Sequence, residues 1–238
     1  MTPAAPGEIA QRLAAVKASV ARACRDAGRD PAEVTLVAVS KKQPLEAMLA
    51  AYEAGQRVFG ENYVQEGAGK AREFLARGLD ARIRFIGGLQ KNKARDAAQF
   101  FAAVETLDSA ELAAKLEAQC VRFGRRLEVL LEINYGEAQK SGLDWPEADA
   151  LLRRAGEFPH LNFAGLMCIP PPRVDAALSR ADFLALRDGM AALRARLPAA
   201  PNVDLRTLSM GMSHDYRIAI ACGATEVRVG TAIFGPRA

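Results

Sequence analysis

A lysine at the end of a long apolar run is the side chain of this sequence with the clearest chemical potential. Lys41 comes after residues 34–39, a nearly continuous β-branched run. If that run lies in a buried sheet, the stem of the lysine is held in surroundings of low dielectric constant. Desolvation of this kind lowers the pKa of a lysine and leaves a neutral amine that condenses with a carbonyl group. The alternative is that Lys41 and Lys42 are both solvated at the mouth of a loop.

Two short segments near the C-terminus have the composition of a phosphate-binding site. Residues 209–213 read Ser-Met-Gly-Met-Ser, and Gly230 and Thr231 follow the apolar run 226–229. Glycine allows backbone N–H groups to approach a phosphate closely, and serine and threonine hydroxyls add further donors. The alternative is that these glycines only form tight turns. The two segments taken together favour a phosphate site.

These residues lie at boundaries in a regular alternation of strand-like and helix-like segments. The predicted strands are residues 34–39, 57–59, 82–86, 103–107, 127–133, 162–167, 203–208 and 226–229. The predicted helices are residues 9–27, 45–54, 63–76, 91–101, 109–123, 146–156, 174–197 and 214–221. Such alternation is typical of βαβ units and a parallel sheet. It predicts an α/β protein with a closed (β/α)8 barrel, the TIM barrel fold, and a doubly wound open sheet is the alternative.

We expect one domain over residues 1–238, in which residues 1–33 form an N-terminal helical extension of the barrel. In such barrels the functional site lies at the carboxyl ends of the strands, and phosphate is often held by the loops after strands seven and eight. Those are the two loops rich in glycine and hydroxyl groups. Arg228 lies inside the eighth strand, where a charged side chain needs an anionic group or a ring acceptor beside it.

Together these residues describe a pocket for pyridoxal 5′-phosphate. Lys41 would hold the C4′ carbon as a Schiff base (a covalent aldimine), and Arg228 would face the pyridine nitrogen. The phosphate would lie in the cradle beside Arg228. An arginine in that place keeps the pyridine nitrogen from full protonation, which weakens the cofactor as an electron sink.

Composition excludes several other classes of protein. The chain has 238 residues, of which 50% are hydrophobic and 25% charged, so it is neither disordered nor of low complexity. The net charge of +4 is spread over short basic stretches without interleaved aromatic residues, and we expect no nucleic-acid binding. Four scattered cysteines and two histidines argue against a zinc site and for a cytoplasmic protein. We expect neither a secretory signal nor a membrane span.

Seven motifs in order resemble the YggS/PROSC family of pyridoxal phosphate homeostasis proteins. They are Leu36-Val-Ala-Val-Ser-Lys41, Phe59-Gly-Glu-Asn-Tyr-Val-Gln-Glu66, Phe85-Ile-Gly-x-Leu-Gln-x-Asn-Lys93, Lys140-Ser-Gly142, Gly165-Leu-Met167, Leu208-Ser-Met-Gly-Met-Ser213 and Val227-Arg-Val-Gly-Thr-Ala-Ile-Phe-Gly235. The resemblance covers nearly the whole chain from Val34 to Gly235. It implies a fold similar to the barrel domain of alanine racemase.

The resemblance also implies roles for single residues. Lys41 is the aldimine lysine, Asn62 lies beside the cofactor ring and Arg228 faces the pyridine nitrogen. The residues implied at the phosphate are Ser209, Met212, Ser213, Gly230 and Thr231. Two positions depart from many relatives, which have histidine where this chain has Arg84 and proline where it has Gly88. Because both adjoin the end of the third strand, we expect them to alter the rim of the pocket.

Lesser candidates have more ordinary interpretations. His214 is predicted to cap a helix rather than to touch phosphate, and Cys168 to be a packed thiol rather than a nucleophile. Lys91 and Lys93 are expected at a solvated helix start, with recruitment of an anion as the alternative. The only tryptophan, Trp145, is expected to have a packing role.

The leading functional hypothesis is a carrier of pyridoxal phosphate that serves intracellular homeostasis, with little or no catalysis. The chain ends at Ala238, and we expect no second domain of the kind that supplies a racemase with its opposite-face tyrosine; Tyr63 and Tyr135 are the only substitutes considered. The alternatives are an amino-acid racemase, a Schiff-base aldolase and a protein-interaction module. We expect a monomer that exchanges cofactor with pyridoxal phosphate-dependent apo-enzymes.

Overall fold

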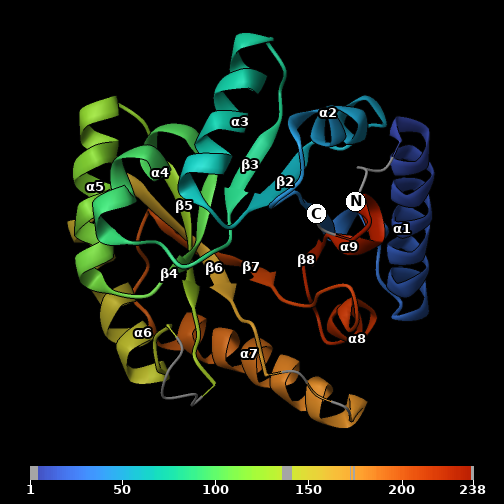
Figure 1. Ribbon diagram of the computed structural model, residues 1–238. Helices are drawn as coiled ribbons and strands as arrows, with labels where there is room; N and C mark the ends of the chain where they lie inside the picture. The colour runs from blue at the N-terminus through green and yellow to red at the C-terminus, as the bar shows by residue number, and fades with distance from the viewer. Residues whose placement is uncertain (1–4, 136–140, 172, 174, 237–238) are drawn as a thin grey trace.

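Eight parallel strands close into a barrel, in the order in which they occur in the chain (Figure 1). The computed structural model describes residues 5–135, 141–171, 173 and 175–236. The closed barrel predicted from the sequence is confirmed, and the open sheet considered as its alternative is wrong. Lys140 of the fourth family motif and Val174, the predicted start of a helix, lie outside the described residues.

The elements follow the predicted alternation closely. The strands are β1 (Thr35–Val39), β2 (Val58–Glu61), β3 (Arg82–Phe85), β4 (Ala103–Leu107), β5 (Leu127–Glu132), β6 (Leu161–Met167), β7 (Val203–Ser209) and β8 (Glu226–Val229). The α-helices are α1 (Pro6–Asp26), α2 (Leu45–Glu53), α3 (Val64–Ala76), α4 (Ala94–Phe100), α5 (Ala110–Phe123), α6 (Trp145–Arg153), α7 (Ala176–Arg196), α8 (Tyr216–Ala221) and α9 (Thr231–Phe234). The 3-10 turns among the described residues are η1 (Pro31–Glu33), η2 (Lys91–Lys93) and η3 (Ala155–Glu157).

Four features differ from the sequence prediction in ways that matter for the site. Glu61 and Ser209 are the last residues of β2 and β7, whereas the sequence placed them in the following loops. A short helix, α9, follows β8, where no helix was predicted. The predicted helix 91–101 begins as the 3-10 turn η2 before it continues as α4. The helix predicted from residue 109 begins there, because the Ser109 hydroxyl caps α5 by accepting the Leu112 N–H at 3.2 Å.

The N-terminal helix α1 is packed onto the outside of the barrel. Ile9, Leu13, Val16 and Val20 recur at helical spacing and are buried, so they form an apolar stripe along this helix. That stripe contacts α2, α8 and α9, and Figure 1 shows α1 lying beside α2 and α9. The helix therefore covers the helices next to β1 and β8. No described helix is long and apolar enough to cross a membrane.

The interior of the barrel contains an unusual number of charged side chains. Barrel interiors are commonly filled by branched apolar residues from alternate strands. Here Arg84 of β3, Glu105 of β4 and Arg228 of β8 are each at most 4% exposed. Arg84 Nε lies 3.2 Å from Glu226 Oε1 of β8, a strand that is not a neighbour of β3 in the sheet, so this contact crosses the interior. The strands are therefore connected by charge inside as well as by backbone hydrogen bonds.

One glycine decides how closely β6 and β7 approach each other. A Cβ atom on Gly165 would lie 1.9 Å from the carbonyl oxygen of Thr207, its partner on β7. We expect Gly165→Ala to lower the free energy of unfolding by about 3 kcal/mol, because backbone cannot yield as a flexible side chain can. Urea unfolding followed by circular dichroism would measure this.

Gly69→Ala is the matched control. A Cβ on Gly69, in α3, would have no atom within 4 Å. Replacing a glycine inside a helix should instead stabilise the protein by about 0.5–1 kcal/mol. If both variants unfold at the urea concentration that unfolds the original chain, the close approach of β6 and β7 is wrong.

Candidate functional site

The carboxyl ends of β1, β2 and β8 bring the predicted lysine beside two other predicted residues. In the sheet β1 lies between β2 and β8, with Val39 opposite Gly60 and Val37 opposite Arg228. The Ser40 N–H also donates to the Gly60 carbonyl at 2.9 Å. Lys41 follows Ser40 and is half-buried. Lys41 therefore lies at the same end of the barrel as Asn62, which directly follows β2.

The loops after β7 and β8 are joined to each other and to β1. The Arg228 N–H donates to the Gly211 carbonyl at 3.0 Å. Gly211 has φ +88°, and a Cβ there would lie 2.5 Å from Ala219 Cβ, so only glycine fits. A Cβ on Gly230 would lie 3.1 Å from the carbonyl oxygen of Val39. The two glycines therefore allow these loops to pack closely next to the strand that leads to Lys41.

The predicted phosphate residues are placed differently within these loops. Ser213 is half-buried, and Thr231 is exposed at the first position of α9. Met212 is 38% exposed, and its N–H already donates to Asp215 Oδ1 at 2.6 Å. Its backbone donor is thus engaged within the loop. Ser213, Gly230 and Thr231 lie in the same two loops as Met212 and also have access to solvent.

Ser209 lies below these loops and contacts Arg228. Its hydroxyl donates to Glu105 Oε2 at 2.6 Å and accepts a hydrogen bond from Arg228 Nη1 at 2.7 Å. The other terminal nitrogen of Arg228, Nη2, donates to the Cys168 carbonyl at 2.8 Å. Both terminal nitrogens of the guanidinium are therefore held in fixed directions. Ser209 is completely buried, which separates it from the loop residues with which the sequence grouped it.

Arg84 lies at the centre of the charge network inside the barrel. Its Nε lies 2.5 Å from Glu105 Oε1 and 3.2 Å from Glu226 Oε1, and its Nη2 lies 2.7 Å from Glu128 Oε1. The sequence placed Arg84 at the rim of the pocket, and that placement is wrong, because its side chain turns into the interior of the barrel and is 4% exposed. Gly88 does lie at the exposed rim, where a Cβ would have no atom within 4 Å.

Glu105 and Glu226, which both face Arg84 Nε, have pKa values shifted in opposite directions. Burial raises the pKa of Glu226 well above its usual value, and the neighbouring charge of Glu105 raises it further. Burial also opposes the charge of Glu105, but Arg84, a hydrogen bond from Glu226 and Arg228 outweigh it and lower the pKa of Glu105. The two pKa values are therefore shifted in opposite directions, which favours a proton on Glu226 rather than on Glu105. Glu105 connects Arg84 through Ser209 to Arg228.

Asn62 and its neighbours border a pocket at the end of β2 and β3. The lining includes Asn62, Tyr63, Gly88 and Lys93. The Oδ1 atom of Asn62 is buried without a hydrogen-bond partner in the described structure. An acceptor that is desolvated and unpaired costs free energy, so its presence at this place favours a ligand that donates to it.

Several lesser candidates are resolved by their contacts. His214 is exposed and Asp215 is the N-cap of α8, so the prediction that His214 caps this helix is wrong. Cys168 is a packed thiol as predicted. It is completely buried, and burial raises its pKa to about 12, which makes it a poor nucleophile. Lys91 is exposed and ion-paired with Glu111. Trp145 packs against the hydrophobic core, as expected.

Tyr135 is tied to the outer layer of the protein. Its hydroxyl donates to the Asp182 carbonyl in α7 at 2.6 Å. Burial raises the pKa of this phenol, and the nearby Cys168 raises it further. A phenol whose proton is bonded to a carbonyl and whose pKa is raised is a poor base at neutral pH. Tyr63, in contrast, is 49% exposed beside the pocket.

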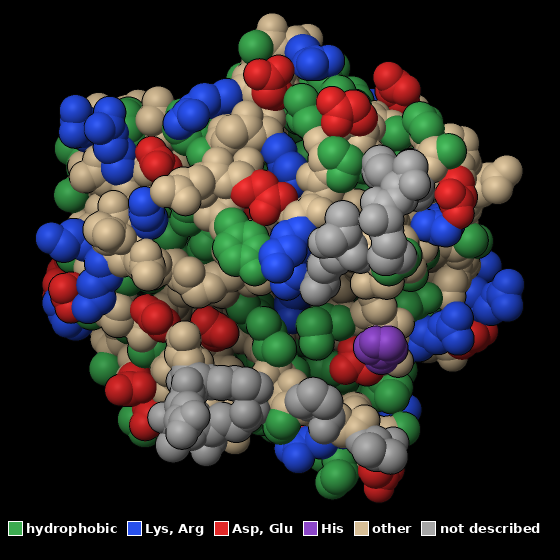
Figure 2. Space-filling view, viewed as in Figure 1, with side chains coloured by type: hydrophobic (Ala, Val, Ile, Leu, Met, Phe, Trp, Pro, Cys, Tyr) green, Lys and Arg blue, Asp and Glu red, His purple; other side chains and the backbone are tan. Residues whose placement is uncertain are grey.

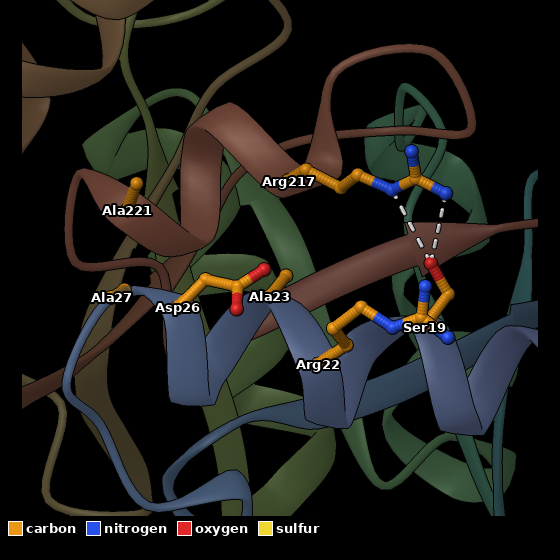
Figure 3. Close-up of a pocket in the computed structure, with 7 residues that line it drawn as sticks. All are labelled: Ser19, Arg22, Ala23, Asp26, Ala27, Arg217 and Ala221. Atoms are coloured by element: carbon orange, nitrogen blue, oxygen red, sulfur yellow. Dashed lines mark hydrogen bonds between the residues drawn. The ribbon is translucent and has the colours of Figure 1, made fainter.

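A second pocket lies on the outside of the barrel, between α1 and α8. Figure 3 shows Arg217 reaching across to Ser19, whose hydroxyl oxygen accepts from Arg217 Nε at 3.2 Å and Nη2 at 3.0 Å. This pocket contains none of the residues predicted from the sequence. Among the residues that the structure describes, no cluster of three or more His, Cys, Asp and Glu side chains could hold a metal ion. On the face seen in Figure 2, basic and acidic side chains are interspersed.

The sequence did not predict the buried glutamates that face Arg84. Glu105 and Glu226 each lie inside a short apolar segment predicted to be a strand, at residues 103–107 and 226–229. A charge within a buried strand needs a partner, and this signal was used for Arg228 but not for the two glutamates. Asp215, which bonds the Met212 N–H, was also missed.

Comparison with known families gives one match over most of the chain. Residues 11–238 match the family model described as alanine racemase, N-terminal domain. The chain is 41% identical over 230 residues to the pyridoxal phosphate homeostasis protein of Haemophilus influenzae, with 96% of each chain covered. It is 42% identical over 232 residues to the protein of that name from Escherichia coli K12, with 97% of each covered.

Solved structures agree with these sequence relatives. PipY of Synechococcus elongatus PCC7942, whose structure was solved with PLP bound, is 37% identical with a TM-score of 0.83, over 95% of this chain and 100% of that one. Alanine racemase of Corynebacterium glutamicum has a TM-score of 0.69 at 17% identity, over 95% of this chain and 60% of that one. The second likeness shows the fold alone.

Two isosteric substitutions test the opposite pKa shifts of Glu105 and Glu226. Glu105→Gln should lower the free energy of unfolding at pH 7 by about 3–5 kcal/mol, because it leaves buried Arg84 without its nearest carboxylate. Glu226→Gln should instead raise the free energy of unfolding, and by a larger amount as the pH rises. A carboxyl whose folded pKa is raised loses stabilisation as pH rises, whereas an amide does not titrate.

The measurement is urea unfolding of both variants and the original chain between pH 5 and pH 9. The difference in free energy of unfolding between Glu226→Gln and the original chain should be smallest at pH 5 and grow with pH. If the two substitutions change the free energy of unfolding equally and independently of pH, the raised pKa of Glu226 is contradicted.

Proposed function

The chain belongs to the family of pyridoxal phosphate homeostasis proteins, and on that premise we propose that it binds pyridoxal 5′-phosphate and serves its homeostasis in the cell, with Lys41 as the residue that holds the cofactor covalently. Bound there, the cofactor supplies an aldehyde that condenses with amines. Lys41 lies at the carboxyl end of β1, between the two strands that carry Asn62 and Arg228. Lys41 therefore follows β1, Asn62 follows β2 and Arg228 lies in β8, and these three strands are adjacent in the sheet.

The residues present fit this cofactor on structural grounds. The unpartnered Oδ1 of Asn62 is buried beside the place where the ring would lie. Gly230 leaves room next to Val39 that a Cβ would fill, and Ser213 and Thr231 bring hydroxyl donors to the same two loops. Phosphate is the group that such donors and close backbone approaches suit.

Arg228 is the observation that carries the proposal. It is 4% exposed, and its two terminal nitrogens are held by Ser209 Oγ and the Cys168 carbonyl. A sugar-phosphate aldolase has no use for a cation fixed inside the barrel at this place. A pyridine nitrogen does, because an arginine with its high pKa donates a hydrogen bond without giving up its proton.

We propose that catalysis by this chain is weak or absent. A racemase needs a base on the face of the cofactor opposite the lysine. Tyr135 cannot serve, because its hydroxyl is bonded to Asp182 O and its pKa is raised. We further propose that the protein acts as a monomer in the cytoplasm and that its partners are apo-enzymes dependent on pyridoxal phosphate. The name that its relatives share supports this role.

An absorption spectrum tests the covalent bond to Lys41. Protein incubated with pyridoxal phosphate should show a visible band that borohydride bleaches, and Lys41→Ala should lack it. Lys42→Ala is the matched control, because Lys42 is exposed and next in sequence, and it should keep the band. A colourless protein, or a band that survives in Lys41→Ala, would refute the assignment. Racemisation of alanine or serine above that of the free cofactor would instead favour the racemase.

Substitutions in the two loops test the place of the phosphate. Ser213→Ala and Thr231→Ala should each weaken cofactor retention by about tenfold without moving the band, because a hydrogen bond to a charged group contributes about 1.5–3 kcal/mol. Arg228→Gln should shift the band, because it changes the group opposite the pyridine nitrogen. Equilibrium dialysis and spectra of the same samples separate the two effects. Unchanged retention in both loop variants would mean that the phosphate lies elsewhere.

A further inference from the structure

A second buried charge cluster lies beside Lys41, and none of its members was assigned a role above. It consists of Ser40, Glu61, Glu66 and Lys70, and we call it the Lys70 cluster. Lys70 Nζ lies 2.8 Å from Glu61 Oε1 and 2.7 Å from Glu66 Oε1. The Ser40 hydroxyl donates to the same Glu61 oxygen at 2.7 Å. Glu61 and Ser40 are completely buried, and Lys70 is 7% exposed.

This cluster holds the backbone on both sides of Lys41. Lys70 Nζ donates to the carbonyl oxygen of Ser40, the preceding residue, at 2.7 Å. Glu66 Oε1 accepts the N–H of Lys42, the following residue, at 2.7 Å. Both holding residues belong to α3, one turn apart. The segment that carries Lys41 is therefore fixed to α3, which is separated from it in the chain by α2 and β2.

The backbone at this point has a conformation that needs such support. Lys42 has φ +57°, in the left-handed region that residues other than glycine seldom adopt. That conformation costs about 1 kcal/mol or more and persists only where surrounding contacts determine it. The bond from the Lys42 N–H to Glu66 is a contact of this kind.

The cluster is poorly suited to a purely stabilising role. Burial raises the pKa of Glu61, against the opposing effects of Lys70 and Ser40. The second carboxylate oxygen of Glu61, Oε2, is buried with no partner in the described structure. Buried ion pairs often contribute no more stability than apolar residues of the same volume, whereas they fix geometry. What this cluster fixes is the peptide on each side of Lys41.

We propose that Lys70 and Glu66 are positioning residues that set the direction of the Lys41 amine at the site. The inference rests on the proposed function, because it gives a purpose to the orientation of that amine. Lys70 acts through the Ser40 carbonyl and Glu66 through the Lys42 N–H, so neither touches the cofactor. A reactive group misplaced by about 1 Å reacts much more slowly, so contacts that fix its position matter.

The experiment compares two alanine substitutions on the same helix. Glu66→Ala removes the acceptor of the Lys42 N–H, whereas Glu73→Ala removes one member of the exposed ion pair that Glu73 forms with Arg77. Each purified protein is loaded with pyridoxal phosphate, and the circular dichroism of the visible band is divided by its absorbance. This ratio reports how rigidly the bound chromophore is oriented, independently of how much is bound. Without cofactor, labelling of Lys41 by trinitrobenzenesulfonate is measured by peptide mass spectrometry.

We expect Glu66→Ala to lower the dichroism ratio by at least about twofold and to change the labelling rate of Lys41 by about tenfold, in keeping with the cost of small misplacements. Glu73→Ala should match the original chain in both measurements. Glu66→Gln keeps a carbonyl acceptor for the Lys42 N–H and should restore most of the effect. Lys70→Arg keeps the charge and should remain close to the original chain, whereas Lys70→Met should resemble Glu66→Ala.

Each outcome has one meaning. If Glu66→Ala and Lys70→Met fold, as judged by far-ultraviolet dichroism, but keep the ratio and the labelling rate of the original chain, the positioning inference is wrong and the proposed function stands. If Lys70→Met does not fold, the comparison of Glu66→Ala with Glu66→Gln still decides. If the original chain itself shows no visible band, the proposed function fails, and the labelling rates without cofactor still test the positioning of Lys41.

Discussion

The ion pair between Arg84 and Glu105 is the interaction on which the interior of this barrel depends. It joins β3 to β4, and through Glu226 it reaches β8 across the interior. Two buried charges repay their desolvation only when each has well-placed partners. Glu105 meets that requirement by accepting from Ser209 as well, and Ser209 in turn accepts from Arg228. A cation at the floor of the site is thereby held by a chain of contacts that begins on the opposite strand.

The charge network around Arg84 and the Lys70 cluster fix different parts of the site. The network of Arg84, Glu105 and Ser209 fixes the guanidinium of Arg228 from below. The Lys70 cluster fixes the segment of Lys41 from the side, through α3. Between them lie two loops whose close packing depends on glycine. In the function we propose, Lys41 would anchor the cofactor and Arg228 would face it from an adjacent strand. The bond from Tyr135 to α7 supports the proposal of little or no catalysis.

Much of this arrangement follows from local sequence. The strands are short apolar runs rich in β-branched residues, so their positions and their number were predictable, and so was the closed barrel. Lys41, Arg228 and the loop at Ser213 were found because each is a polar residue at or within such a run. The boundaries were harder, because hydrogen bonding between strands decides whether Glu61 and Ser209 extend a strand or begin a loop.

Partners across the barrel could not be predicted from one sequence. Arg84 looks like a rim residue when only its distance from the end of a strand is considered, yet it contacts Glu226, which lies 142 positions later, because closure of the sheet brings β3 and β8 to face one another. The sequence by itself determined the order of the strands, the lysine and the loops that meet at one end. Only the tertiary structure decided which charged side chains are paired, in which direction the pKa of Glu226 is shifted and which helix holds the segment of Lys41. Each of these depends on distances between residues far apart in the chain.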